Sequence, residues 1–354
     1  MSGARDGTGA PAADIAALAE EVGAERVVET RAAHVLLTAD RAYKLKKPGA
    51  DGHFDYRTPE LRRAACADEV RLNAPLAGDV YLGVRPVRRT QAGGITLRPG
   101  PGAPVDFAVE MRRLPDAAML DRMLEAGRTP PPERLAALSR RLVAFYRETA
   151  PLPADHAGWH AAFLLRTAEE SRAGLADWEP ELGPAATRVP ARAIAALESH
   201  RDEIVARVRA GRVVDGHGDL RPEHVCLTDP VVVFDRVEFS AAIRAVDPHA
   251  EIAVLGLECA LLGAPSIGPA LREDLAAAGF PPPSDGLSAA WHAARCALRA
   301  RQCMDHLRDP QPRRPESWAP RALRYLAAAE TAPALARADG AGRGAGAGRG
   351  DGDQ

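Results

Sequence analysis

The most constraining feature of the sequence is a change of pattern near Pro115. Before it, short apolar segments with alternating character are separated by turn residues, which is typical of β-strands, and helical spacing is the exception. After it, apolar residues recur mostly at helical spacing. The chain is therefore predicted to be α+β, with a small β-rich N-lobe at 14–112 and a larger helical C-lobe at 113–337. The ends, 1–13 and the Gly/Arg-rich 338–354, lack apolar anchors and are expected to be disordered.

The same patterns predict the individual elements. Strands are expected at 35–38, 42–46, 79–87, 95–99 and 105–114, and helices at 15–22, 59–74, 116–126, 131–149, 159–176, 188–211, 249–263, 268–278, 285–308 and 318–331. Thr58 and Pro59 are typical of a helix start, as the N-cap and the first helical residue. One β interruption is predicted in the helical part, a hairpin of 225–227 and 231–234.

Composition limits the classes of partner. A length of 354 residues favours two lobes over one, and a net charge of -2 gives no overall field for holding nucleic acid or a membrane surface. No apolar run approaches the roughly 20 residues of a membrane-spanning helix, and residues 1–13 lack the apolar core of a signal peptide. The five scattered cysteines argue against a disulfide framework or a zinc cage. A cytoplasmic protein is expected, with no nucleic-acid or membrane partner.

Lysine is almost absent from the chain. Of 46 basic residues, three are lysine, and all fall together at Lys44, Lys46 and Lys47. In the predicted strand, Lys44 and Lys46 share a face. The compact ammonium of lysine suits a phosphate oxygen, whereas arginine presents a planar fork. The cluster indicates a phosphate contact, with a basic strand edge that discourages aggregation as the alternative.

A second constellation flanks the predicted hairpin. It reads His217-Gly218-Asp219-Leu220-Arg221-Pro222-Glu223-His224, then the apolar run Val231-Val232-Val233-Phe234 that ends on Asp235. In phosphoryl transfer a protein neutralises the phosphates, orients the nucleophile and accepts its proton. Carboxylates and a basic residue at this spacing therefore point to a kinase.

The stretch from His217 to His224 resembles the catalytic loop of protein-kinase-like enzymes, His-Arg-Asp-Leu-Lys-Pro-Glu-Asn. Its His-Gly-Asp opening is similar to that of aminoglycoside phosphotransferase and choline kinase relatives. Together with Ala42–Leu82, it resembles an uncharacterised bacterial branch of that family over roughly residues 17–310. The resemblance implies a two-lobed protein-kinase-like fold, with ATP and Mg²⁺ as cofactors.

The resemblance also implies roles for the catalytic-loop residues. Asp219 corresponds to the base that accepts the substrate hydroxyl proton, with a helix or turn cap as its alternative, and Asp235 to the Mg²⁺ ligand. Arg221 stands where the loop faces the transferred phosphate, with a surface pairing to Glu223 as its alternative. His217 is expected to hold the loop through backbone hydrogen bonds rather than to act as acid or base.

In the N-lobe, Ala42-Tyr43-Lys44 resembles the family's Ala-x-Lys. This implies that Lys44 contacts the α- and β-phosphates and pairs with Glu69 on the following helix; a solvated helix carboxylate is the alternative for Glu69. Lys46 is the second choice for the phosphate contact. Glu110 and Met111, near the end of the last strand of the lobe, are expected to form the hinge that binds adenine.

The sequence departs from the family at the metal site. His224 replaces the metal-binding Asn, and imidazole is a poor ligand for Mg²⁺. Asp235-Arg236-Val237 replaces Asp-Phe-Gly, and Glu238 offers a nearby carboxylate. A single metal held mainly by Asp235 is therefore expected. Segment 28–38 also lacks the glycines that let backbone amides approach phosphates.

The expected function is transfer of the γ-phosphate of ATP to a hydroxyl of a small molecule. The sequence indicates neither the acceptor nor the oligomeric state. One alternative is a nucleotide-binding pseudokinase, which the replacement at His224 favours. Another is a metal-dependent hydrolase that uses His217, Asp219, His224 and Asp235, with Asp247 and His249 as further candidates. A helical scaffold with solvated charges is the third, and a P-loop enzyme is excluded because Gly-Lys-Ser/Thr is absent.

Overall fold

The computed structural model describes residues 12–309 and 312–331 of the chain. Of the two segments expected to be disordered, residues 1–11 and 338–354 lie outside the described residues. Helix α1 (Ala12–Glu21) includes the last two residues of the first segment. The helix predicted at 15–22 is thus present, with an earlier start.

The chain forms two compact units. Among the described residues, the first comprises 12–149, Gly216–Arg244 and Glu258–Ile267, and the second Ala150–Asp215, Ala245–Leu257, 268–309 and 312–331. The lobe boundary at residue 112, inferred from the sequence, stays a prediction. All the residues singled out above for the phosphoryl-transfer site lie in the first unit.

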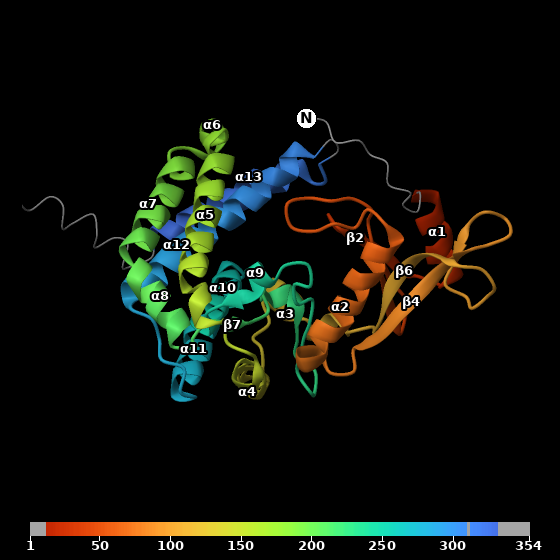
Figure 1. Cartoon of the computed structure of the whole chain (residues 1–354), viewed down its shortest axis with the longest axis horizontal. Coiled ribbons are helices and arrows are strands. Elements are labelled where there is room, and N and C mark those ends of the chain that lie inside the picture. Colours follow the sequence, from red (N-terminus) through yellow and green to blue (C-terminus); the bar gives the residue numbers. More distant parts are fainter. Residues whose placement is uncertain (1–11, 310–311, 332–354) are drawn as a thin grey trace, which may run out of the picture. The chain divides into compact units, whose positions relative to one another are not determined.

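A six-stranded antiparallel sheet forms the β part of the first unit (Figure 1). Its strands, in spatial order, are β1 (Arg26–Glu29), β2 (Ala33–Leu37), β3 (Arg41–Lys46), β6 (Pro104–Arg112), β4 (Tyr81–Arg89) and β5 (Ile95–Thr96). Strand β1 was not predicted from the sequence. It is short, and all four of its residues are exposed, so it offers no buried face. Strand β3 lies between β2 and β6, with Lys44 opposite Val35 and Val109.

Helix α2 (Pro59–Ala77) follows β3 in the chain and packs against β6 and β4. Figure 1 shows it lying beside β4 and β6. As predicted, Thr58 caps the helix by accepting a hydrogen bond from the Leu61 N–H, and Pro59 occupies the first turn. Buried Cys66 of α2 shares an apolar core with Val109 and Met111 of β6. This core fixes the face of α2 that is turned toward the sheet.

The rest of the first unit is mainly helical, with the predicted hairpin inserted. It contains α3 (Leu120–Glu125), α4 (Pro132–Glu148), the 3-10 turn η3 (Pro222–His224), β8 (Val225–Cys226), β9 (Val232–Val233) and α9 (Ala241–Arg244). Val225 pairs with Val233, and Cys226 with Val232. The short hairpin therefore places the segment from 217 to 224 before β8, and Asp235 directly after β9.

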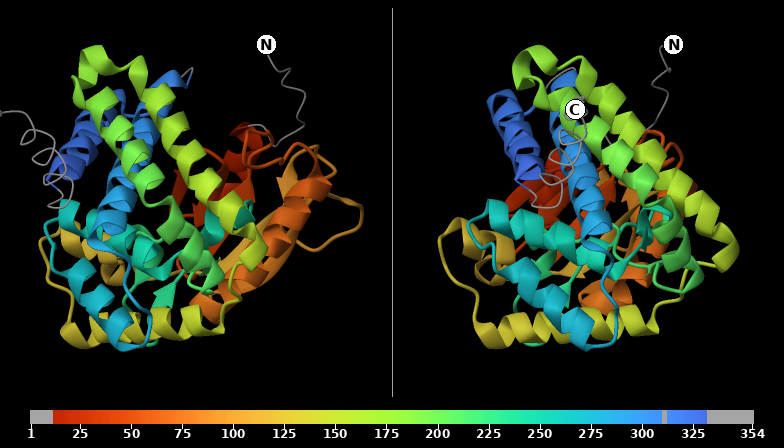
Figure 2. Two further views of the ribbon diagram at one scale, coloured as in Figure 1. Left: turned by 60° about the vertical axis from the view of Figure 1, so that its left-hand side comes forward. Right: turned by 90° about the vertical axis from the view of Figure 1, so that its left-hand side faces the viewer.

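The second unit is built on long helices. The longest are α5 (Ala157–Ala176), α7 (Ala185–Ser199), α12 (Asp285–Asp305) and α13 (Pro315–Glu330). The shorter helices α6 (Glu179–Leu182), α8 (Arg201–Arg209), α10 (Pro248–Leu261) and α11 (Ile267–Ala277) lie at or within its bounds. Both views of Figure 2 show α5, α7 and α12 running beside one another. Their contact faces are rich in buried alanines, such as Ala161, Ala193 and Ala290. Small side chains let the helices approach closely.

Two expectations for this unit are wrong. The single helix predicted at 188–211 is divided into α7 and α8 at His200, whose φ of -106° and ψ of 15° are not helical. The His200 imidazole lies 2.8 Å from the Ala196 carbonyl oxygen, a local side-chain bond that competes with helix continuation. The hairpin is also not the sole β pairing in the helical part, because β7 (Val214–Asp215) pairs with β10 (Ala245–Val246). Two-residue strands are too short to leave a periodic signal.

The α+β class predicted from the sequence is confirmed: an antiparallel sheet with one helix packed against it is followed by a mainly helical remainder. Across the described ranges 12–309 and 312–331, no helix is both long and apolar enough to cross a membrane. All five cysteine side chains are buried, as expected of small apolar packing residues.

Candidate functional site

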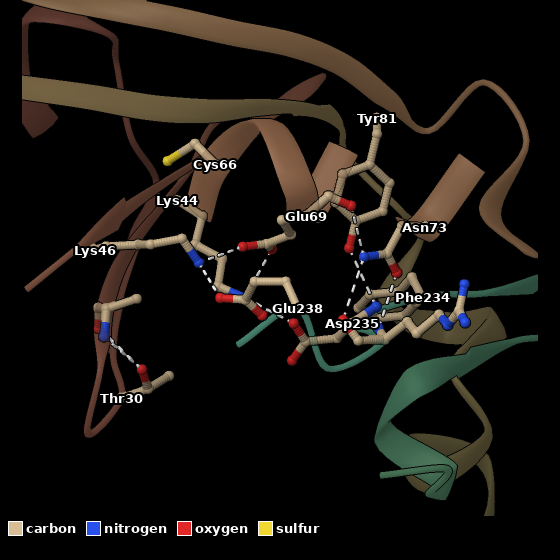
Figure 3. Close-up of polar contacts among 12 residues, drawn as sticks. Thr30, Lys44, Lys46, Cys66, Glu69, Asn73, Tyr81, Phe234, Asp235 and Glu238 are labelled. Atoms are coloured by element: carbon tan, nitrogen blue, oxygen red, sulfur yellow. Dashed lines mark hydrogen bonds and ion pairs between the residues drawn. The ribbon is translucent and has the colours of Figure 1, made fainter. Parts of the chain in front are cut away.

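The lysines of β3 converge on one glutamate of α2. Lys44 Nζ donates to Glu69 Oε1 at 2.8 Å, and Lys46 Nζ donates to Glu69 Oε2 at 2.7 Å (Figure 3). Residues two apart in a strand project to the same side, so both side chains reach the helix that covers that face. The structure thus brings together the predicted pair of Lys44 and Glu69. The Glu69 carboxylate is fully buried, which contradicts the alternative of a solvated helix carboxylate.

Each lysine has a second carboxylate partner from the segment after β9. Lys44 Nζ lies 2.6 Å from Asp235 Oδ1, and Lys46 Nζ donates to the Glu238 carboxylate. The Lys46 side chain is 1% exposed, whereas the Asp235 side chain is 38% exposed. The two lysines therefore differ in kind: Lys44 adjoins an accessible carboxylate, and Lys46 is enclosed between two buried ones.

Electrostatics keep these groups charged. Burial alone would raise the pKa of Glu69, but Lys44 and Lys46 outweigh it and hold the pKa of Glu69 below its usual value. Burial likewise opposes the charged form of Asp235, yet Lys44 keeps the pKa of Asp235 low. Burial would lower the pKa of each lysine, and the carboxylates raise it instead. With two ammonium groups and three carboxylates, counting Glu238, the cluster has a formal charge of -1.

Asp235 lies on a strained turn whose backbone is hydrogen-bonded to neighbouring side chains. Its φ of 61° lies in the left-handed region, which is uncommon for residues other than glycine and is found at functional sites. The Asp235 N–H donates to the Tyr81 hydroxyl at 3.1 Å, and the Arg236 N–H donates to Asn73 Oδ1 at 2.9 Å. Asn73 Nδ2 in turn donates to the Glu69 carbonyl oxygen at 2.9 Å. Helix α2 therefore positions both the lysine partner and the turn that carries Asp235.

The loop before β8 is fixed by His217. This side chain is fully buried, and its Nε2 lies 2.8 Å from the Phe234 carbonyl oxygen. Because a carbonyl only accepts, Nε2 carries the proton and Nδ1 can accept from the Asp219 N–H at 3.3 Å. Burial lowers the pKa of His217 to about 4, so the ring is neutral at neutral pH. This geometry fits the backbone-holding role expected from the sequence.

Gly218 is required between His217 and Asp219. Its φ of 87° is left-handed, and a Cβ there would lie 3.3 Å from atoms of both Ile243 and Arg244. A larger residue would be strained in conformation and crowded in space. The glycine lets the loop turn so that Asp219 follows directly on buried His217.

Asp219 and Glu223 flank Arg221. Arg221 Nε lies 3.0 Å from Asp219 Oδ2, an ion contact outside hydrogen-bond geometry, and Arg221 Nη1 lies 2.8 Å from Glu223 Oε1. Burial would raise the pKa of Glu223, but Arg221 outweighs it and lowers that pKa. The pairing with Glu223 that the sequence left open is present. It also keeps the guanidinium beside the Asp219 carboxylate.

His224 links the loop to Asp235. Its Nδ1 lies 2.8 Å from the Asp219 carbonyl oxygen, and its Nε2 lies 3.4 Å from Asp235 Oδ2. The ring is buried and stacks on His217 with a centroid distance of 5.7 Å. The predicted catalytic loop and the predicted metal ligand are thus joined through one imidazole.

Glu238 is engaged by groups other than a metal. Besides Lys46, its carboxylate accepts a hydrogen bond from the Tyr56 hydroxyl at 2.7 Å. Burial raises the pKa of Tyr56, so the hydroxyl keeps its proton and remains a donor. Glu238 also lines a cavity of about 220 Å³ whose walls include Phe54, Tyr56 and Phe239.

Glu110 and Met111 lie inside β6, which is paired with β3 on one side and β4 on the other. The Glu110 carboxylate lies 2.9 Å from Arg85 Nε. The backbone of Glu110 and Met111 is therefore paired within the sheet. Backbone pairing extends to the Arg113 N–H, which donates to the Asp40 carbonyl oxygen at 2.9 Å. Binding of adenine by Glu110 and Met111 stays a prediction.

The geometry does not favour a metal-dependent hydrolase. Both ring nitrogens of His217 bond the backbone, and Arg207 Nε donates to Asp247 at 2.6 Å. His249 Nε2 lies 2.9 Å from a carbonyl oxygen. Within the part of the chain that the structure describes, no three His, Cys, Asp or Glu side chains gather as metal ligands would.

Three residues of the site were not predicted from the sequence. Asn73 follows Glu69 by four residues, so the pattern of a helix would have placed a second polar side chain on that face. Tyr81 and Tyr56 are different, because each meets a partner more than 150 residues away. No spacing within the sequence predicts these two contacts.

Comparison with curated proteins finds uncharacterized relatives. No family model matches the chain. Uncharacterized proteins of Mycobacterium bovis and Mycobacterium tuberculosis are 30% identical to it over 251 residues, which cover 68% of this chain and 47% of each relative. The chain thus spans about half the length of these curated relatives.

Comparison with solved structures finds a choline/ethanolamine kinase family protein and two phosphotransferases. A choline/ethanolamine kinase family protein from Mesorhizobium loti is 13% identical, with a TM-score of 0.47 over 92% of this chain and 95% of that one. Spectinomycin phosphotransferase in complex with ADP and spectinomycin is 9% identical, with a TM-score of 0.47 over 87% and 91%. An aminoglycoside phosphotransferase from Streptomyces rimosus, in complex with ADP and streptomycin, is 15% identical, with a TM-score of 0.45 over 81% and 97%.

The chain's own contacts fit the protein-kinase-like fold expected from the sequence. Protein kinases pair a lysine of the third strand with a glutamate of the next helix. Lys44 of β3 and Glu69 of α2 form this pair. At such low identities, a function for the chain has to be argued from its own side chains.

Proposed function

We propose that the chain is an ATP-dependent phosphotransferase of the aminoglycoside phosphotransferase and choline kinase-like kind, which transfers the γ-phosphate to a hydroxyl of a small molecule. The observation that carries the proposal is the contact of Lys44 with both Glu69 and Asp235, next to the loop that bears Asp219. A phosphate-binding lysine, its orienting glutamate and a metal-binding aspartate must be assembled together for phosphoryl transfer. The cytoplasmic location stays a prediction.

Each residue has a distinct part in the proposed reaction. Lys44 binds the phosphates while Glu69 holds its ammonium in place. Asp219 accepts the proton of the acceptor hydroxyl as that oxygen attacks the γ-phosphorus, and the bond from the γ-phosphorus to the bridging oxygen breaks, which leaves ADP. Arg221, 3.0 Å from Asp219, supplies positive charge where the transferred phosphate gains negative charge.

The residues present fit a divalent metal at Asp235. Its carboxylate is an oxygen ligand of the kind that Mg²⁺ prefers, and its side chain is accessible. A bound metal would supply positive charge across the phosphates. Glu238 does not fit this role, because Lys46 and Tyr56 already engage its buried carboxylate.

Lys46 and Glu238 are proposed as positioning residues. Lys46 is enclosed by Glu69 and Glu238, so it lacks the access that a phosphate contact needs. The ion pair instead ties β3 to the segment three residues after Asp235. This revises the phosphate contact and the metal-ligand role that the sequence suggested for Lys46 and Glu238.

A nucleotide-binding protein with little transfer is the second candidate. One observation in its favour is that His224, which contacts Asp235, replaces the asparagine of the family. Another is the ion contact between Arg221 and the Asp219 carboxylate. A tight ion pair lowers the basicity of a general base. Nucleotide binding would then persist without turnover.

A screen of hydroxylated metabolites for ADP release tests the proposal. With Mg²⁺-ATP, we expect at least one small alcohol to raise ADP release well above the rate with water alone, and the phosphorylated product to be detectable by mass spectrometry. Glu223→Gln is a suitable comparison, since it leaves Asp219 in place. Nucleotide binding without ADP release for any acceptor would favour the second candidate instead.

A further inference from the structure

We propose that the metal position beside Asp235 prefers a divalent first-row transition metal, such as Mn²⁺ or Co²⁺, to Mg²⁺, because His224 presents an imidazole nitrogen to it. The inference rests on the proposed function, in which this metal accompanies the nucleotide. It concerns the identity of the ion and the residue that selects it.

The tautomer of His224 is set by the loop. Nδ1 lies 2.8 Å from the Asp219 carbonyl oxygen, which can only accept, so Nδ1 carries a proton. In the neutral ring, Nε2 then has a lone pair, and it faces Asp235 Oδ2. A carbonyl that fixes one nitrogen while the other faces outward is the usual arrangement of a metal-binding histidine.

The spacing of the two donor atoms suits one ion. Nε2 and Oδ2 lie 3.4 Å apart, longer than the usual N–H···O hydrogen bond. Two ligands each about 2.1 Å from an ion lie about 3.4 Å apart at a tetrahedral angle and about 3.0 Å apart at a right angle. The other oxygen of Asp235, Oδ1, is the one that Lys44 contacts. Oδ2 and Nε2 are therefore the pair that a metal would share.

The donor set decides the preference. Mg²⁺ takes oxygen ligands almost exclusively, whereas an imidazole nitrogen strengthens binding along the series from Mn²⁺ to Co²⁺ and Ni²⁺. Glu238 cannot restore an all-oxygen site, since it is engaged by Lys46 and Tyr56. With one nitrogen and one carboxylate from the protein, the remaining ligands would be phosphate oxygens and water. Binding of the metal should therefore depend on nucleotide.

Pulsed EPR of Mn²⁺ with ATP and nitrogen-15-labelled protein detects this contact without any need for turnover. We expect a nitrogen-15 coupling in the wild type, because the label distinguishes protein nitrogen from the nitrogens of unlabelled ATP. The coupling should vanish in His224→Asn and persist in His53→Asn, which removes an exposed histidine of the same unit. Bound Mn²⁺-ATP that shows no nitrogen-15 coupling in the wild type would overturn the inference and leave the proposed function intact.

Affinities give an independent readout. The dissociation constant of Co²⁺-ATP should be at least about tenfold lower than that of Mg²⁺-ATP in the wild type, and the ratio should approach one in His224→Asn. An equal ratio in the two proteins would contradict the role of His224. Failure of ATP to bind with Mg²⁺, Mn²⁺ or Co²⁺ would overturn the proposed function, and this inference with it.

Discussion

Asp219→Asn is expected to lower the rate of phosphoryl transfer by about 10²- to 10⁴-fold, the usual contribution of a general base. The amide keeps the shape of the side chain but cannot accept the hydroxyl proton. Lys44 and Asp235, which are proposed to hold the phosphates, stay in place, so the affinity for ATP should change little. The measurement pairs ADP release under saturating ATP with the dissociation constant of the same variant.

Glu223→Gln is the matched control for Asp219→Asn. It removes the other carboxylate that contacts Arg221, at 2.8 Å, without touching the proposed base. Its rate should fall far less than that of Asp219→Asn. If the two variants lost activity equally, or if Asp219→Asn turned over normally, the assignment of Asp219 as base would be wrong.

The second large effect concerns stability. Lys46→Met should lower the free energy of unfolding by about 3–5 kcal/mol, the range for removal of one partner from a buried ion pair. The Lys46 side chain is 1% exposed, and without it Glu69 and Glu238 would remain buried with less positive charge nearby. Urea titration of wild type and variant measures the difference.

Lys47→Met provides the comparison one residue further along the chain. Its ammonium pairs with Glu29 at a site that is 24% exposed for Lys47 and 48% for Glu29. Exposed pairs contribute about 0–1 kcal/mol, so this variant should unfold almost as the wild type does. A similar small loss for Lys46→Met would show that the buried network does not hold the segment after β9.

The contacts of Lys44 and Lys46 with Glu69 could be anticipated from the sequence because they depend on local periodicity. Strand alternation puts Lys44 and Lys46 on one face, and the cap at Thr58 starts a helix whose length brings Glu69 to them. The hairpin after the catalytic loop is likewise a local pattern. These features need only the strand and helix repeats and the order of elements along the chain.

The remainder of the site depends on packing between distant segments. Asn73 holds the Arg236 N–H, and Tyr81 holds the Asp235 N–H, across separations of 163 and 154 residues. The difference in exposure between Lys44 and Lys46 could not be predicted either, because both are lysines on the same face of one strand. Their burial separates a candidate phosphate contact from a positioning residue.

The most direct measurement of the central claim is the binding of Mg²⁺-ATP to wild type, Lys44→Met and Lys47→Met. At 100 times its dissociation constant, the nucleotide should stabilise the wild type by about 2.7 kcal/mol. Loss of one charged hydrogen-bonding partner should weaken binding about tenfold or more in Lys44→Met, and Lys47→Met should bind as the wild type does. No stabilisation of the wild type at millimolar nucleotide, or equal binding by all three proteins, would contradict an ATP site at Lys44.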